Sequence, residues 1–296
     1  MPTDRTTDIL RELLVRQLTT WLPAALHRSR RATIALGWAG DDAGGAAAAL
    51  GVVAEHADRL RGRRVTVLVL ADGATDLPAR LGPIEADLPA EVTVHVLPGT
   101  PDRLPVAVKA AGAAGAPLFC FVDVPGAVTP ELLAAASNGR TGEVLLHAPA
   151  GARDALVAAG FPLVAEVVPV LPDGTAAGVI AFGSRSDRSL EAVRDALWAV
   201  GADLGVRYRD PVDPAGAPVD VAGDPDLDPL ARELLVELRR GGPRPVTELR
   251  RHTLTATVYR AADATRALTG LLDAGDVRRD RESGRLAGDE IITVTR

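Results

Sequence analysis

The strongest constraint on the fold is a regular alternation of short apolar runs with helical segments through the first half of the chain. Apolar runs rich in β-forming residues occur at 32–36, 65–70, 92–97, 117–122 and 143–147, and segments with helical spacing separate them. Strands that alternate with helices form βαβ units, in which the strands lie parallel. The runs are almost wholly apolar, as expected when helices cover both faces of a sheet. We therefore expect a Rossmann-like α/β domain.

Two further patterns extend this domain. Residues 8–26 carry apolar side chains at helical spacing on one stripe, which predicts an N-terminal helix. Residues 163–171 and 177–182 are rich in β-forming residues and flank the turn tripeptide Pro172-Asp173-Gly174. These two runs are predicted to pair as an antiparallel hairpin at the end of the parallel sheet. A parallel sheet that ends in such a hairpin is typical of class I methyltransferases.

A change of composition divides the chain. Residues 206–228 are rich in Pro, Asp and Gly, which is typical of a linker. We therefore expect a methyltransferase-like α/β domain over residues 1–210, a linker over 211–228 and a small domain over 229–296.

The small domain is predicted to contain three helices and a hairpin. Helical spacing covers 230–240, 246–251 and 258–274, and two short β-forming runs follow at 276–281 and 290–294. Three helices followed by a β-hairpin is the order of a winged helix. We therefore expect a winged-helix-like domain at the C-terminal end of the sequence.

Charge and cysteine content exclude several classes of site. The 33 basic and 39 acidic residues give a net charge of −6, which excludes a polyanion-binding surface over the whole molecule but leaves a local basic patch open. The single cysteine, Cys120, excludes an intramolecular disulfide and a Cys-rich zinc cluster. Because Cys120 lies in an apolar run, we expect a buried, unreactive thiol rather than a reactive one.

No targeting or membrane-spanning segment is indicated. Charged residues interrupt the apolar stripe at 9–26, so it does not resemble a signal peptide. The Ala-rich stretch 44–54 is too short to cross a bilayer. We expect a cytoplasmic protein that does not associate with a membrane.

Several segments resemble the three-Cys-motif partner family, whose members are similar to S-adenosylmethionine-dependent methyltransferases. The glycine-containing segment Leu36-Gly37-Trp38-Ala39-Gly40 stands where that family has an Asp-x-Phe-Ala-Gly-Pro-Gly loop. The strand that ends in Asp123-Val124-Pro125-Gly126 is similar to the family's strand ending in Asp-Pro-Phe-Gly. The helix ending in Trp21-Leu22-Pro23, the segment Val179-Ile180-Ala181-Phe182-Gly183 and the segment Ala196-Leu197-Trp198 also match in order. The resemblance covers most of the chain.

The resemblance implies a cofactor site and a transfer site. S-adenosylmethionine would bind at the loop after the first strand and at the end of the second strand, through Gly37, Gly40, Asp42, Gly44 and Asp72. The transfer site would contain Asp123 and Pro125. Their places after strands suit this role, because ligands bind at the carboxyl ends of strands in open α/β sheets.

The sequence also departs from the family at the residues that matter most. Leu36 stands where an acid normally binds the cofactor, and an apolar side chain cannot accept a hydrogen bond. Asp41-Asp42 replaces the Pro-Gly of the loop, and glycines return only at Gly44-Gly45. These changes favour a divergent member that has lost catalysis.

Each candidate residue also has a plainer interpretation. The glycine loop is compatible with an ordinary strand-to-helix turn, and Asp72 and Asp123 with turn or capping residues. His147 ends a predicted strand and could act as a base near neutral pH, or it could simply bond to the backbone. The other histidines, His27, His56, His95 and His252, are scattered without metal-ligand spacing. The chain contains neither a Gly-x-Ser-x-Gly motif nor a Walker loop.

The small domain offers a second class of function. A DNA-binding winged helix would place its third helix, around 255–268, in the major groove, with Arg278, Arg279 and Arg281 in the wing. However, residues 226–296 contain 13 arginines and 12 acidic residues, a smaller excess than nucleic-acid-binding domains usually show. The sequence thus leaves two hypotheses: a divergent methyltransferase-like protein, or a non-enzymatic protein whose small domain contacts a protein partner or DNA.

Overall fold

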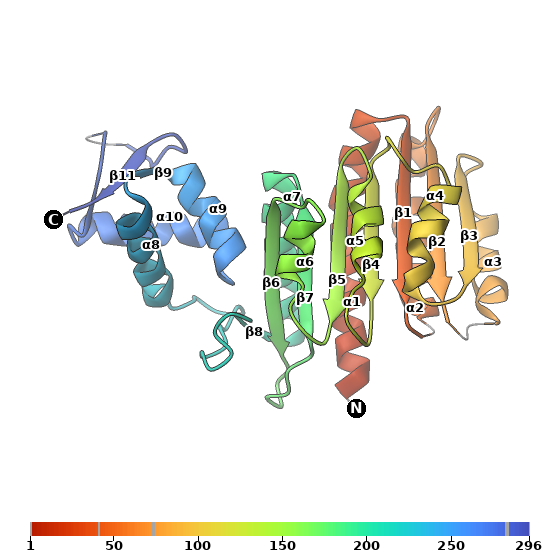
Figure 1. Ribbon diagram of the computed structural model, residues 1–296, viewed down its shortest axis with the longest axis horizontal. Coiled ribbons are helices and arrows are strands. Elements are labelled where there is room, and N and C mark those ends of the chain that lie inside the picture. Colours follow the sequence, from red (N-terminus) through yellow and green to blue (C-terminus); the bar gives the residue numbers. More distant parts are fainter. Residues whose placement is uncertain (1, 41, 73–74, 282–283, 296) are drawn as a thin grey trace.

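The computed structural model describes residues 2–40, 42–72, 75–281 and 284–295. Figure 1 shows a larger α/β body and a smaller C-terminal body beside one end of its sheet. Within the described ranges, no helix combines the length and the apolar character needed to span a bilayer.

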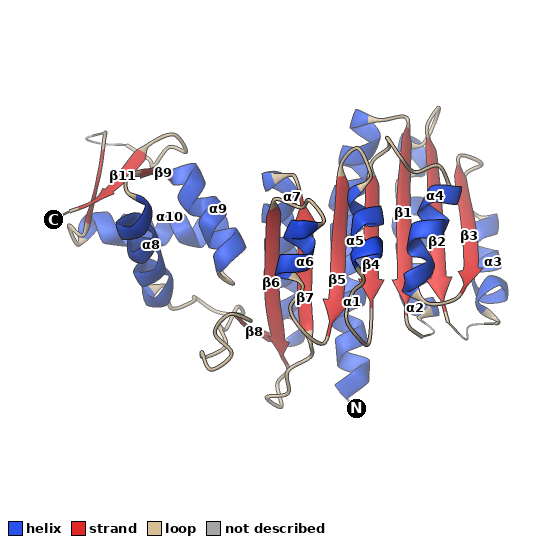
Figure 2. Cartoon of the chain, in the orientation of Figure 1, coloured by secondary structure: helices blue, strands red, loops and turns tan. Residues whose placement is uncertain are grey.

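In the described part of the chain, eight strands form the sheet of the larger body (Figure 2). They are β1 (Arg31–Trp38), β2 (Arg64–Ala71), β3 (Val92–Pro98), β4 (Leu118–Asp123), β5 (Gly142–Ala148), β6 (Leu163–Val170), β7 (Val179–Ser184) and β8 (Arg207–Arg209). Their order is β3-β2-β1-β4-β5-β7-β6-β8. The first five strands pair in parallel, whereas β7 is antiparallel to both of its neighbours and β8 is antiparallel to β6. The expected α/β class is confirmed, and the sheet is compatible with a Rossmann-like fold.

Helices cover both faces of this sheet, as the apolar strands predict. One face packs against α1 (Pro2–Arg28), α2 (Ala43–Glu55), α3 (Leu77–Ala86) and α7 (Asp187–Leu204). The other packs against α4 (Leu104–Ala110), α5 (Pro130–Ser137) and α6 (Arg153–Ala158). Alternate side chains of each strand enter the two separate cores. Cys120 is buried in the second core, as expected, and burial raises the pKa of its thiol.

The N-terminal helix is longer than its sequence pattern predicts. It was expected over 8–26, but α1 runs from Pro2 to Arg28 and passes through Pro23. A proline inside a helix removes one backbone hydrogen bond. Here Leu18, Leu22 and Leu26 are fully buried against the sheet. Their burial continues across the proline and holds both halves of the helix in place.

The late hairpin forms as predicted. Strands β6 and β7 pair antiparallel, from Leu163 with Ser184 to Val167 with Ile180. The turn between them is closed by hydrogen bonds between Leu171 and Thr175 and between Gly174 and Leu171. Because β7 lies between β5 and β6, it brings the loop before it to the carboxyl end of β5.

The smaller body has helices and strands in the order helix, strand, two helices, two strands. They are α8 (Asp228–Gly241), β9 (Arg244–Pro245), α9 (Val246–Ala256), α10 (Ala261–Asp273), β10 (Val277–Arg279) and β11 (Ile291–Val294). The expected hairpin is present as β10 and β11, and the two-residue β9 adds an unpredicted third strand on the other side of β11. A helix expected over 258–274 starts only at Ala261, because Asp263 accepts a hydrogen bond from the Arg260 N–H and caps it there.

The segment expected as a linker is partly packed onto the larger body. Val219 and Tyr208 exchange backbone hydrogen bonds of 2.7 and 3.1 Å, so the chain doubles back along β8. Val221 is buried against the same core. The segment that connects the two bodies is therefore held against the larger body and is not a free linker.

Helix α7 fixes the smaller body through the C-terminal end of α9. Arg194 is only 1% exposed, and its Nη2 donates to the carbonyl oxygens of Leu254 at 2.9 Å and Thr257 at 2.8 Å. Burial lowers the pKa of Arg194 to about 10, so the guanidinium stays charged at neutral pH. Trp198 Nε1 donates to the Val258 carbonyl at 2.9 Å. A cation at the carbonyl end of a helix is electrostatically favourable and satisfies carbonyls that lack partners within the helix.

We predict that Arg194→Met detaches the smaller body from the larger one. The change leaves the carbonyls of Leu254 and Thr257 without their donor, at a cost of roughly 3 kcal/mol. Urea denaturation followed by proteolysis near residue 225 should reveal earlier release of residues 226–296. Arg188→Met on the exposed face of the same helix is the control. Equal stability of the two variants would contradict a structural role for Arg194.

Candidate functional site

The carboxyl edge of the sheet brings Asp123 and His147 together. They end the neighbouring strands β4 and β5 and lie opposite each other in the strand register. The His147 Nδ1 atom lies 2.7 Å from Asp123 Oδ1, and its Nε2 lies 2.8 Å from the carbonyl oxygen of Ala177. The ring therefore bonds to the backbone, as one of the two interpretations from sequence expected, and also to a carboxyl side chain.

These two partners determine the protonation of His147. When Asp123 is ionised, both partners of the ring are acceptors, so His147 then donates from both nitrogens and carries a positive charge. Burial opposes this charge, but the hydrogen bonds to Asp123 and Ala177 outweigh it, and the net effect raises the pKa of His147. A His147 that donates from both nitrogens has no lone pair with which to accept a proton from a substrate.

Gly178 makes room for the His147 ring. Its φ of +73° is strained for other residues, and a Cβ built on it would lie 2.6 Å from His147 Nε2. Neither Ala177 nor Gly178 was indicated as a site residue by the sequence. The one available signal was a glycine inside the predicted strand 177–182, where a glycine often marks close approach of another group.

The loop expected to hold a cofactor is filled largely by the protein itself. Gly37 is buried on β1, and a Cβ built on it would lie 3.2 Å from the Pro101 side chain. Asp42 caps α2 by accepting a hydrogen bond of 2.8 Å from the Gly45 N–H. Gly40 and Gly44 are exposed beside this cap. Asp41 lies outside the described residues.

The other residues expected in the cofactor and transfer sites lie separately, after different strands of the same edge. Asp72 is exposed just beyond the end of β2, and Pro125 is exposed beyond β4. Leu36 points into the apolar core behind the sheet and is fully buried. Asp123 keeps a third of its side chain exposed while it pairs with His147. In the described part of the chain, no three His, Cys, Asp or Glu residues are grouped to hold a metal ion.

The arginines expected to face DNA are mostly paired within the smaller body. Arg279 lies 3.4 Å from Glu290 and donates to the Gly284 carbonyl, and Arg281 bonds to Asp289 at 2.7 Å. Arg278 is exposed on β10. On α10, Arg266 bonds to Asp224 at 2.6 Å. Residues 255–268, expected as one helix, span the end of α9, a turn and most of α10.

A second buried polar group lies at the opposite edge of the sheet. Glu143, near the start of β5, accepts a hydrogen bond of 2.6 Å from the Ser189 hydroxyl. Its Oε2 is buried without a hydrogen-bond partner among the described residues, as is Gln17 Oε1. Burial, opposed by the hydrogen bonds from Ser189 and Ser184, raises the pKa of Glu143 to about 7. No site residue was predicted here, because the buried neighbours come from three distant segments.

Comparison with known proteins adds no relative. No protein-family model matches the chain, and no curated protein is significantly similar to it. The chemistry of the site therefore has to be inferred from its own residues.

We predict that Asp123→Asn destabilises the fold by roughly 2 kcal/mol near pH 6, because a buried cation loses its charged partner. His147 has a raised pKa, so the stability from its charge is complete below its ordinary value of 6.5 and is lost as pH rises through the raised value. The difference between wild type and variant should therefore shrink at high pH. Thermal melts between pH 5 and 9 test this. Asp72→Asn, at the same edge but exposed, is the control.

We also predict that Glu143→Gln removes a pH dependence of stability. The pKa of Glu143 is raised from 4.5 to about 7, so its favourable contribution is present below pH 4.5 and lost as pH rises to 7. The wild type should lose roughly 3 kcal/mol from this group between pH 4 and 8. Urea titrations of wild type, Glu143→Gln and the exposed control Glu131→Gln measure it. Parallel pH profiles for all three proteins would show that Glu143 is not shifted.

Proposed function

We propose that this protein has a methyltransferase-like scaffold that has lost methyl transfer and acts by binding. The antiparallel β7 between β5 and β6 supports the first part, because a terminal antiparallel hairpin is what the resemblance to class I methyltransferases implies. The helix-strand order of the smaller body supports the winged-helix-like assignment. The proposed loss of methyl transfer is supported by the residues at the carboxyl edge of the sheet.

The main support for lost methyl transfer comes from the residues at the carboxyl end of β1. S-adenosylmethionine would need an acid and an open glycine turn there. Leu36 is buried in the core instead of offering a carboxylate, and Pro101 lies over Gly37. The one acid of the loop with a described place, Asp42, already caps α2. The residues present therefore do not fit this cofactor.

The transfer residues support the same proposal. Asp123 is engaged by His147, and both ring nitrogens of His147 contact groups that can accept hydrogen bonds. A general base needs an unshared electron pair, which a ring that donates from both nitrogens lacks. The pair joins three segments of chain and acts as a structural tie at the place where the resemblance implies catalysis.

A protein partner is favoured over DNA for the smaller body. Arg266, Arg279 and Arg281 are each paired with acids of this protein. Such arginines would have to break these pairs to neutralise phosphates. Binding to DNA depends on phosphate neutralisation and counterion release.

We predict that neither S-adenosylmethionine nor S-adenosylhomocysteine binds. A ligand at 100 times its Kd would raise stability by about 2.7 kcal/mol, so a thermal shift at 1 mM ligand detects Kd values near 10 μM. Calorimetry should show no heat, and the melting temperature should not change. Binding by wild type that Asp72→Ala abolishes would restore the catalytic hypothesis and refute ours.

We predict no salt-dependent binding of DNA by the full chain. Fluorescence anisotropy with a labelled 20-base-pair duplex in 20 mM salt should stay at its starting value. Affinity that falls steeply with salt, and that Arg278→Gln reduces, would instead support a DNA-binding function through the hairpin.

A further inference from the structure

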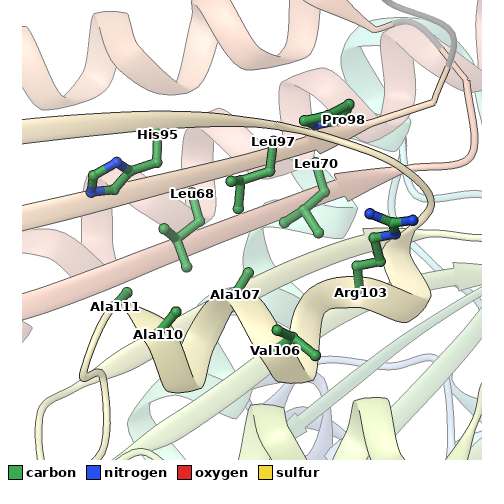
Figure 3. Close-up of a pocket in the computed structure, with 10 residues that line it drawn as sticks. All are labelled: Leu68, Leu70, His95, Leu97, Pro98, Arg103, Val106, Ala107, Ala110 and Ala111. Atoms are coloured by element: carbon green, nitrogen blue, oxygen red, sulfur yellow. The ribbon is translucent and has the colours of Figure 1, made fainter.

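An apolar groove lies on the sheet face that α4 leaves partly uncovered. It has a volume of about 500 Å³, and neither Asp123 nor His147 belongs to its lining. Figure 3 shows the residues that line it. Its floor is formed by Leu68 and Leu70 of β2 and Leu97 of β3. Ala107, Ala110 and Ala111 form the facing wall, and their small side chains leave the space open.

The two ends of the groove are polar. Arg103 stands at one end, beside Pro98, and His95 at the other. The Arg103 side chain lies across Gly99, where a Cβ would come within 2.7 Å of its Cδ. Gly99 has a φ of +128°, so other side chains are disfavoured there and the path of Arg103 stays clear. Within the described residues, the guanidinium forms no hydrogen bond or ion pair.

We propose that this groove binds a small aliphatic monocarboxylate. Ligand sites are typically cavities of 300–1,000 Å³ with mostly apolar walls and a few polar groups that fix orientation. An apolar chain along α4 would cover the floor leucines, and its carboxylate would pair with Arg103. From Leu104 to Ala111 the helix rises about 10 Å, which suits a chain of roughly eight carbons.

Charge complementarity decides the class of ligand. The unpaired guanidinium favours an anion, and Arg binds carboxylates through two parallel hydrogen bonds. Between Arg103 and His95 the lining is apolar and disfavours a second charge, because an unpaired charge is costly to bury. The exposed Val106, at 72%, extends the apolar rim and adds contact for the chain.

The proposal goes beyond the proposed function and is independent of it. Asp72, Asp123 and Gly37 do not line the groove. A protein that bound S-adenosylmethionine could still bind a carboxylate here, and the reverse is equally possible. The two tests can therefore fail separately.

The experiment is calorimetry of the full chain with octanoate, and with 1-octanol as a neutral ligand of equal length. Wild type should bind octanoate more tightly than octanol. Arg103→Gln should weaken octanoate about tenfold and leave octanol unchanged. Lys109→Gln, which removes a cation from the same helix outside the groove, should change neither.

A second variant tests the cavity. Ala110→Leu fills the groove from an exposed position and should abolish binding of both ligands while the circular dichroism spectrum is retained. No binding of octanoate by wild type at millimolar concentration, or equal losses in Arg103→Gln and Lys109→Gln, would overturn the proposal. So would sedimentation showing a wild-type dimer that Ala110→Leu converts to a monomer, because a second copy would then cover the groove.

Discussion

The arrangement of the carboxyl edge depends on one side chain, His147, which lies between the Asp123 carboxyl group and the Ala177 carbonyl. Its ring joins the end of β4, through Asp123, to the loop before β7, through Ala177. These segments are distant in sequence and meet only because β7 inserts beside β5. Pro101 beside Gly37 and Asp42 on the end of α2 add two further contacts within the protein at this edge.

The α/β sheet is present, whereas the residues at the carboxyl end of β1 do not suit the cofactor that the resemblance implies. Open α/β sheets bind ligands at the carboxyl ends of their strands, so unsuitable residues there remove the usual binding place of a cofactor. An apolar groove of about 500 Å³ lies instead on the face of β2 and β3 beside α4. A protein that keeps the sheet but closes its edge can still bind through such a face or through the smaller body, which Arg194 and Trp198 hold firmly.

The sequence predicts the local features well and the contacts between distant segments poorly. The five parallel strands and the late hairpin follow from apolar periodicity and from Pro172-Asp173-Gly174, which are local signals. The first and last residues of α1, 2–7 and 27–28, were not predicted, because they lie beyond the apolar stripe over 8–26 that marked the helix. Asp123 and His147 were each found as strand-end residues. Their pairing, and the role of Gly178 beside the ring, depend on a strand order that periodicity does not give.

The central claim is that His147 is a doubly protonated structural cation and not a free base. Long-range ¹H–¹⁵N correlation spectra of the histidine rings at pH 7 test it most directly. We predict that both ring nitrogens of His147 show the chemical shifts of protonated imidazolium and that Asp123→Asn returns the ring to a neutral tautomer. A neutral His147 in the wild type, with one nitrogen carrying a lone pair, would contradict the account and leave a base available at the carboxyl edge.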